Sequence, residues 1–154
     1  MNAVATQTKH LLVDGNNVGR AWKLTAILWR RDTFAAQRKL EEMVRVWHDA
    51  MGWRVSLVFD GRGAELTVEQ PTQEASFVVA HAPTGVTADD VLVQWVVNSR
   101  VAEDCVVATA DRGLRQLVEA QGASVIGPME LKAWLARADD VARRGAARWN
   151  ARNI

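Results

Sequence analysis

Short apolar runs recur along the chain, and several of them stop at an aspartate. Leu11–Val13 is one such run, and it leads directly into Asp14, Gly15 and two asparagines. Runs of this length, rich in apolar residues and bounded by glycine, proline or polar residues, are typical of buried strands. A weaker run at 66–68 fits either a short strand or part of a loop. The predicted strands are 11–13, 53–59, 77–80, 105–108 and 124–126.

Between these runs, apolar residues return every three or four positions, which is the period of an amphipathic helix. The clearest case is 32–51, where Asp32 or Thr33 fits the N-cap and Gly52 follows as the stop. The predicted helices are 32–51, 87–98, 114–120 and one that starts at 128, and the tail from 139 is expected to be helical although Gly145 weakens it.

Strands and helices alternate along the chain, and this alternation predicts an α/β fold with a mainly parallel central sheet. Right-handed crossovers would place helices on both faces of that sheet. The 154 residues suit one domain with a closed core, and neither a low-complexity linker nor a repeat divides them. We expect a flexible N-terminus at 1–8, a folded domain at 9–136 and a basic helix or tail at 137–154.

Composition narrows the classes of function. Hydrophobic residues make up 49% and charged residues 24%, and a net charge of +1 gives no global field that would attract nucleic acid, so any basic surface must be local. Cys105 lies alone inside an apolar run, which excludes an internal disulfide and a thiol zinc site and favours a buried strand residue over a nucleophile. The N-terminus lacks a signal-peptide core and no stretch is long enough to span a membrane, so we expect a cytoplasmic protein without membrane contact.

Three predicted strands run into an aspartate. Asp14 and Asp60 follow the first and second strands in the similar contexts LLVDG and LVFDG, and Asp111 follows the fourth. Parallel strands bring their carboxyl ends to one edge of the sheet, which is where open α/β sheets bind ligands. Asp89, at the start of the helix after the third strand, would face the same edge. We therefore expect these four carboxylates to converge.

Carboxylates that share a pocket repel each other, unless a divalent cation lies between them or one takes up a proton. Oxygen ligands without a nearby histidine or cysteine suit Mg²⁺ or Mn²⁺ rather than Zn²⁺. Asn16 and Asn17 are placed to orient the carboxylates by hydrogen bonds. Taken singly, each aspartate also fits a turn or a helix cap, and Asp90, three residues after Thr87, has the spacing of a capping box. The metal site is indicated by the coincidence of several aspartates at equivalent positions.

The order and spacing of four motifs resemble the NYN domain of the PIN-like nuclease superfamily, in its YacP-like branch. The resemblance covers 9–135 and implies a three-layer α/β/α fold and a metal-dependent endoribonuclease. By motif, it makes Asp14, Asp89 and Asp111 the metal-binding and catalytic carboxylates, gives Asp60 a less defined catalytic position and matches Asn17 to a substrate-binding asparagine of the family. The four motifs are LLVDGNNV, VSLVFDG, GVTADDVLVQWV and VVATADRGLRQLVEAQGASVIGPMEL.

The sequence departs from the family pattern at one position. Many PIN-like domains carry a second acidic residue two positions after the one matched by Asp111, and here that position is Gly113. Such a site would hold one ion rather than two, or hold it weakly until RNA supplies phosphate oxygens. The alternative is a catalytically weak or inactive module that binds RNA or a ribosome-associated partner.

The expected reaction is attack of a metal-activated water on an RNA phosphodiester, which leaves a 5′-phosphate and a 3′-hydroxyl. Arg62, Arg112 and Arg20 follow the strands that carry the aspartates and are candidate contacts to the RNA backbone, although each also fits an ordinary surface arginine. The tail would make a second basic patch that holds RNA or a ribosome, or keeps a terminal helix soluble. Its arginines are Arg143, Arg144, Arg148 and Arg152.

Other chemistries fit less well. His10, His48 and His81 are scattered, and no Ser-His-Asp or Cys-His arrangement is evident. A phosphohydrolase of the haloacid dehalogenase kind needs a second aspartate where Asn16 stands. The segment 15–19 also lacks the glycine spacing of a dinucleotide-binding loop.

The chain contains seven tryptophans and no tyrosine. Trp47 and Trp95 recur at helical spacing with other apolar residues and are expected in the core. Trp22, Trp29 and Trp149 lie beside arginines or lysines, where they could stack on bases, although packing is the favoured role.

Overall fold

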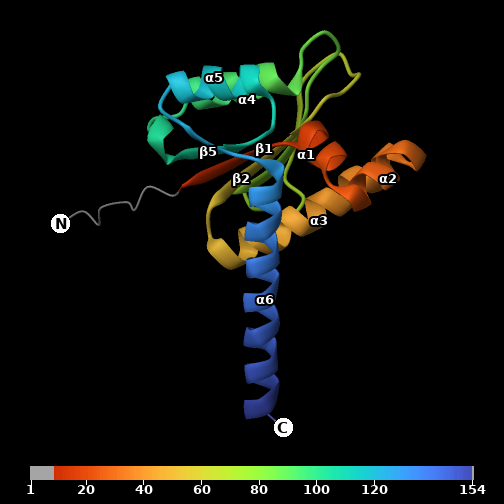
Figure 1. Cartoon of the computed structure of the whole chain (residues 1–154), viewed down its shortest axis with the longest axis vertical. Coiled ribbons are helices and arrows are strands. Elements are labelled where there is room, and N and C mark those ends of the chain that lie inside the picture. The colour runs from red at the N-terminus through yellow and green to blue at the C-terminus, as the bar shows by residue number, and fades with distance from the viewer. Residues whose placement is uncertain (1–8, 154) are drawn as a thin grey trace, which may run out of the picture.

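Six strands form one sheet in the computed structural model of the protein, which describes residues 9–153 (Figure 1). The strand order is β3-β4-β2-β1-β5-β6, and all pairs are parallel except β3 with β4. The expected flexible N-terminus at 1–8 lies outside the described residues. The strands are β1 (His10–Asp14), β2 (Arg54–Phe59), β3 (Thr67–Glu69), β4 (Phe77–His81), β5 (Cys105–Ala108) and β6 (Ser124–Ile126).

Helices cover both faces of the sheet, so the predicted three-layer α/β/α architecture is confirmed (Figure 1). Helices α1, α3 and α6 contribute to the core on one face, and α4 and α5 contribute to the core on the other. A 3₁₀ turn at Ala102–Asp104 precedes β5. The helices are α1 (Gly15–Ala21), α2 (Lys23–Arg31), α3 (Thr33–Met51), α4 (Ala88–Val97), α5 (Arg112–Ala120) and α6 (Pro128–Arg152).

Strand β1 shows why the apolar runs are continuous rather than alternating. Its side chains point alternately to the two faces, so Leu11 and Val13 enter one core and Leu12 enters the other. All three are fully buried because β1 lies between β2 and β5 in the middle of the sheet. Both faces of such a strand must therefore be apolar.

The segment between β1 and α3, for which the sequence predicted no helix or strand, folds into α1 and α2. Gly15 is the first residue of α1, and a Cβ there would lie 2.5 Å from two ring carbons of Phe59, so glycine is needed for close packing. Trp22 separates the two helices, is 3% exposed and donates its indole N–H to the carbonyl of Pro128 over 2.8 Å. Neither helix was predicted, since both are short and held by such tertiary contacts.

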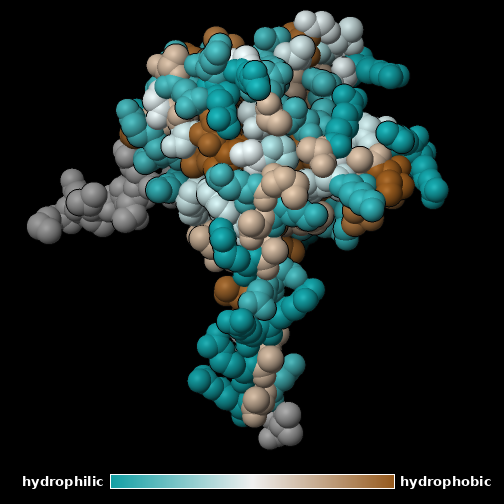
Figure 2. All heavy atoms as spheres, viewed as in Figure 1, coloured by the Kyte–Doolittle hydropathy of each residue, from teal (hydrophilic) through white to brown (hydrophobic). Residues whose placement is uncertain are grey.

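Helix α6 continues past Gly145 to Arg152 without a break, and its C-terminal half projects from the body of the domain (Figure 1). The projecting half is mainly hydrophilic (Figure 2) and carries Trp149, which is 65% exposed. The expected boundary at 136 falls inside this helix, and the division into domain and tail stays a prediction. No helix among residues 9–153 is long and apolar enough to cross a membrane.

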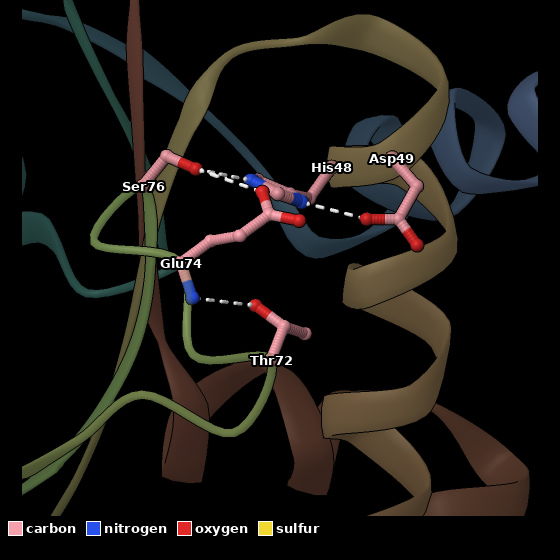
Figure 3. A network of polar contacts seen from close by, with 5 residues as sticks. All are labelled: His48, Asp49, Thr72, Glu74 and Ser76. Carbon is pink, nitrogen blue, oxygen red and sulfur yellow. Dashed lines mark hydrogen bonds and ion pairs between the residues drawn. The ribbon is translucent and has the colours of Figure 1, made fainter.

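A polar network links the end of α3 to the segment before β4 (Figure 3). The buried ring of His48 contacts Asp49 through Nδ1 and Ser76 through Nε2, each over 2.9 Å, and the Ser76 hydroxyl also lies 3.4 Å from Glu74. Ser76, His48 and Asp49 thus contact one another in sequence, an arrangement that was not evident from their positions along the chain. The network lies near the amino ends of the strands, opposite the aspartates, and it joins α3 to the sheet.

Candidate active site

The carboxyl edge of the sheet brings the four aspartates together as the sequence predicts. Asp14 is the last residue of β1, Asp60 and Asp111 follow β2 and β5, and Asp89 lies in the first turn of α4. Burial, followed by the charges of Asp111 and Asp60, raises the pKa of Asp89. Mutual repulsion of this kind requires the carboxylates to share one region of the surface.

Asp14 is the most enclosed member of the cluster, at 4% exposure. Its Oδ2 accepts a hydrogen bond from the hydroxyl of Thr109 over 2.9 Å. Burial raises the pKa of Asp14 to about 7; the bond from Thr109 opposes this rise, whereas the charge of Asp89 adds to it. At neutral pH this carboxyl is therefore poised between its protonated and ionised forms.

Thr109 is a site residue that the sequence analysis missed. It is fully buried at the end of β5, and its Oγ1 accepts from the backbone N–H of Asp111 over 3.1 Å while donating to Asp14. Asp111 in turn caps α5, because its Oδ1 accepts from the N–H of Leu114 over 2.9 Å. One feature of the sequence could have indicated it, because Thr109 stands two residues before Asp111 at the end of an apolar strand. A hydroxyl buried there needs a hydrogen-bond partner, and a carboxylate at the same edge can provide one.

The two asparagines after β1 brace the loops on either side. The Oδ1 of Asn16 accepts from the N–H of Asp60 over 2.9 Å, and the Oδ1 of Asn17 accepts from the N–H of Ala110 over 2.8 Å. The expected orienting role is thus exerted through the backbone of the neighbouring loops. The side-chain oxygen of Asn17 is engaged in this contact, and its expected role in substrate binding stays a prediction.

Asp60 links the loop after β2 to α4. Its Oδ1 accepts from the N–H of Ala88 over 2.8 Å, which fixes the helix turn that carries Asp89. Asp90 and Thr87 form the reciprocal contacts of a capping box, so the cap expected at Asp90 is confirmed. The charge of Asp89 raises the pKa of Asp14, whereas the side chain of Asp90 is engaged in the cap.

The three arginines expected to contact RNA make no ion pairs among the described residues. Arg20 lies at the end of α1, with its guanidinium 5.7 Å from the ring centroid of Trp29, and Arg112 is the first residue of α5. Arg62 is exposed in the loop after β2, where its carbonyl accepts from the hydroxyl of Thr84 over 2.7 Å. Their positions fit cations that meet a polyanion, and the contact itself stays a prediction.

A metal centre is not preformed in the described part of the chain, because no three histidine, cysteine, aspartate or glutamate side chains there have metal-binding proximity. The donor chemistry still fits a hard cation: the groups are carboxylates, and burial and mutual repulsion raise the pKa of Asp14 and of Asp89. A Cβ at Gly113 would lie 3.3 Å from Oδ1 of Asp111. The missing acidic residue would therefore stand directly beside the cluster.

The parallel sheet, the two helical layers and the aspartates at the carboxyl edge define an α/β domain of the PIN-like kind. The profile of the YacP-like NYN domain matches residues 11–153, and the chain belongs to that family.

Solved structures agree with this assignment. The crystal structure of Rae1 (YacP) from Bacillus subtilis superposes with a TM-score of 0.76 at 22% identity, over 95% of this chain and 84% of the other. Its W164L mutant gives a TM-score of 0.77 at 22% identity, over 94% and 85% of the two chains. At this identity the likeness shows the fold. No curated protein sequence matches the chain.

Proposed function

We propose that this protein is an endoribonuclease that requires Mg²⁺ or Mn²⁺. The observation that carries the proposal is the aspartate cluster, in which a buried carboxyl, Asp14, is held at the carboxyl edge of the sheet beside Asp89 with a pKa raised to about 7. NYN domains form a PIN-like nuclease family, and the chain is a member of it.

Asp14, Asp89 and Asp111 would hold the cation, with Asp60 beside them. A bound divalent cation would supply Lewis-acid stabilisation of phosphate charge and a more acidic water. The chain's own residues fix the carboxylates: the hydroxyl of Thr109 holds Asp14, and the backbone of α4 holds Asp60. The phosphates of RNA would bring further negative charge to the aspartates. The proposed role of the arginines is to offset that repulsion.

RNA is the proposed substrate, and its backbone would contact Arg20, Arg62 and Arg112. The ribosome is a candidate partner for the projecting part of α6, where Arg148 and Arg152 are exposed. Localisation in the cytoplasm would suit both. Oligomeric state does not enter the proposal.

The test is cleavage of a panel of labelled RNAs with Mn²⁺, with Mg²⁺ and with EDTA. Wild-type protein is expected to cut in the metal samples alone, and Asp14→Asn is expected to lose activity by at least about a hundredfold. Asp104→Asn is the matched control, because Asp104 precedes β5 at the opposite edge and its substitution should leave cleavage unchanged. Cleavage that persists in folded Asp14→Asn would contradict the assigned site.

A second function is favoured by Gly113, namely a catalytically weak module that binds RNA or a ribosome-associated partner. The two functions are separated by Gly113→Asp, which adds a carboxylate beside Asp111. In an active nuclease the substitution should tighten Mn²⁺ binding and change cleavage severalfold. RNA binding without cleavage in both the wild type and Gly113→Asp would support the binding module.

A further inference from the structure

A cavity opens at the amino edge of the sheet, at the opposite end of the strands from the aspartates. Its volume is about 520 Å³, and its lining includes Lys9 before β1, Trp53 before β2 and Ser124 at the start of β6. Because β1 is five residues long, roughly 16 Å of strand separates this edge from Asp14. The cavity is therefore a place separate from the proposed nuclease site.

Three tryptophans form one wall of the cavity. Trp47 and Trp134 are stacked, with ring centroids 5.8 Å apart and an interplanar angle of 12°. Trp53 meets both edge-on, at 5.0 Å from Trp47 and 5.9 Å from Trp134. Trp53 and Trp134 are only partly buried, so ring surface remains accessible from the cavity. Flat aromatic surfaces of this kind favour planar ring systems.

The charged residues of the lining have one sign. Lys9 and Arg137 both line the cavity and both are exposed at its rim, and no aspartate or glutamate among residues 9–153 lines it. The Lys9 ammonium lies 5.4 Å from the ring centroid of Trp53, so one of the cations is already placed beside the aromatic wall. The two cations therefore suit an anionic group of a ligand, and the tryptophan wall beside them suits an aromatic ring.

We propose that this cavity binds a nucleoside monophosphate, with the base against the tryptophans and the phosphate between Lys9 and Arg137. The volume lies within the roughly 300–1,000 Å³ that is usual for small-ligand sites. The same combination of base and phosphate occurs in a free nucleotide and in the terminal nucleotide of an RNA strand. The proposal goes beyond the nuclease function and does not depend on it.

Isothermal titration calorimetry tests nucleotide binding to the cavity. EDTA is present throughout, because it removes the divalent cation that the proposed RNA cleavage requires. The probes are AMP, UMP, adenosine and inorganic phosphate, and AMP should bind at least about tenfold more tightly than adenosine or phosphate, its two parts. A phosphorothioate oligonucleotide titrated beside AMP distinguishes the two sources. Tighter binding of the oligonucleotide would assign the site to an RNA end, and equal or weaker binding would assign it to the free nucleotide.

Arg137→Glu should weaken AMP binding by about tenfold or more, and Lys9→Ala should weaken it by a smaller factor. Lys132→Glu is the matched control, because it makes the same charge reversal on an exposed position of α6 outside the cavity lining, and it should leave affinity within about twofold. RNA cleavage measured on the same variants reports on the nuclease site separately.

Three results would overturn the proposal, and the first two concern nucleotide binding. One is the absence of heat with AMP and UMP from folded protein; the other is binding that Arg137→Glu and Lys132→Glu weaken equally, since that would be general attraction of an anion to α6. A concentration-dependent dimer that Arg137→Glu dissociates, without any nucleotide binding, would assign the cavity to a second copy of the chain and also refute the proposal.

Discussion

At the scale of single residues, the buried carboxyl of Asp14 makes stability depend on pH. Burial raises its pKa from 3.8 to about 7. Between these values the native state keeps a proton that the unfolded chain has lost, so the contribution of Asp14 to stability is present below pH 4 and is lost as pH rises through 7.

Asp14→Asn should therefore stabilise the metal-free protein at pH 8. The ionised carboxyl costs the native state on the order of 4 kcal/mol, of which an isosteric amide should recover about 2 kcal/mol. Urea unfolding in EDTA at pH 8 and pH 4 measures the difference, which should disappear at the lower pH. A variant that is less stable than wild type at pH 8 would contradict the raised pKa.

Thr109 is expected to matter through its hydroxyl. Thr109→Val removes the hydrogen bond to Asp14 and leaves the N–H of Asp111 without its side-chain acceptor, so it should cost about 1–3 kcal/mol and raise the pKa of Asp14 further. Thr109→Ser keeps both contacts and is the control. Urea unfolding gives the stability, and an NMR titration of the Asp14 carboxyl gives the pKa; a loss in Thr109→Ser as large as that in Thr109→Val would contradict a specific role of the hydroxyl.

The limits of sequence-based prediction are also visible in single residues. Asp14, Asp60, Asp89 and Asp111 could be placed together because parallel strands share an edge. The position of Thr109 just before Asp111 is visible in the sequence, but its partner Asp14 lies 95 positions away, and no local pattern identifies that partner. The same holds for the contact between His48 and Ser76 (Figure 3), which depends on how the end of α3 meets the start of β4.

At the scale of elements, the sheet followed from the sequence more readily than α1 and α2 did. A central strand needs apolar residues on both faces, so β1, β2 and β5 stand out as continuous runs. Helix α1 has only seven residues and includes Gly15 and Gly19, both of which face aromatic rings too closely for a Cβ. Its helical state comes from packing, which local propensity does not contain.

The junction between α1 and α2 should be held by the indole of Trp22. Trp22→Phe leaves the buried carbonyl of Pro128 without this donor and should reduce the free energy of unfolding by about 1–3 kcal/mol. Trp149→Phe on the projecting part of α6 is the control and should stay within about 0.5 kcal/mol. Chemical denaturation of both variants measures the contrast, and equal losses would argue against a specific role of the Trp22 hydrogen bond.

At the scale of the whole molecule, the first part of α6 packs against the domain and the last part projects into solvent. Leu131, Leu135 and Ala138 are buried against the body, whereas 142–152 are exposed throughout. The ion pairs Arg143–Asp139 and Arg144–Asp140 lie on the outside of the helix and add little to stability.

Removal of 143–154 should therefore leave the folded domain intact. The midpoint of urea unfolding is expected to stay the same and the stability to change by less than about 1 kcal/mol, because no buried side chain of the described residues is lost. Cleavage of short free RNAs should persist, whereas any binding to a ribosome through α6 should weaken. A large loss of stability would mean that the projecting half packs against something in solution.

The bracing of two loops by Asn16 and Asn17 has a consequence for local unfolding. Asn16 and Asn17 both lie in the first turn of α1. A transient opening of that one helix would therefore release the backbone N–H of Asp60 and the backbone N–H of Ala110 in the same event. These two backbone N–H groups, 50 positions apart in sequence, should exchange with deuterium at matched rates and with the same dependence on denaturant. The carboxylate edge would then come apart as one cooperative unit while the centre of the sheet stays closed.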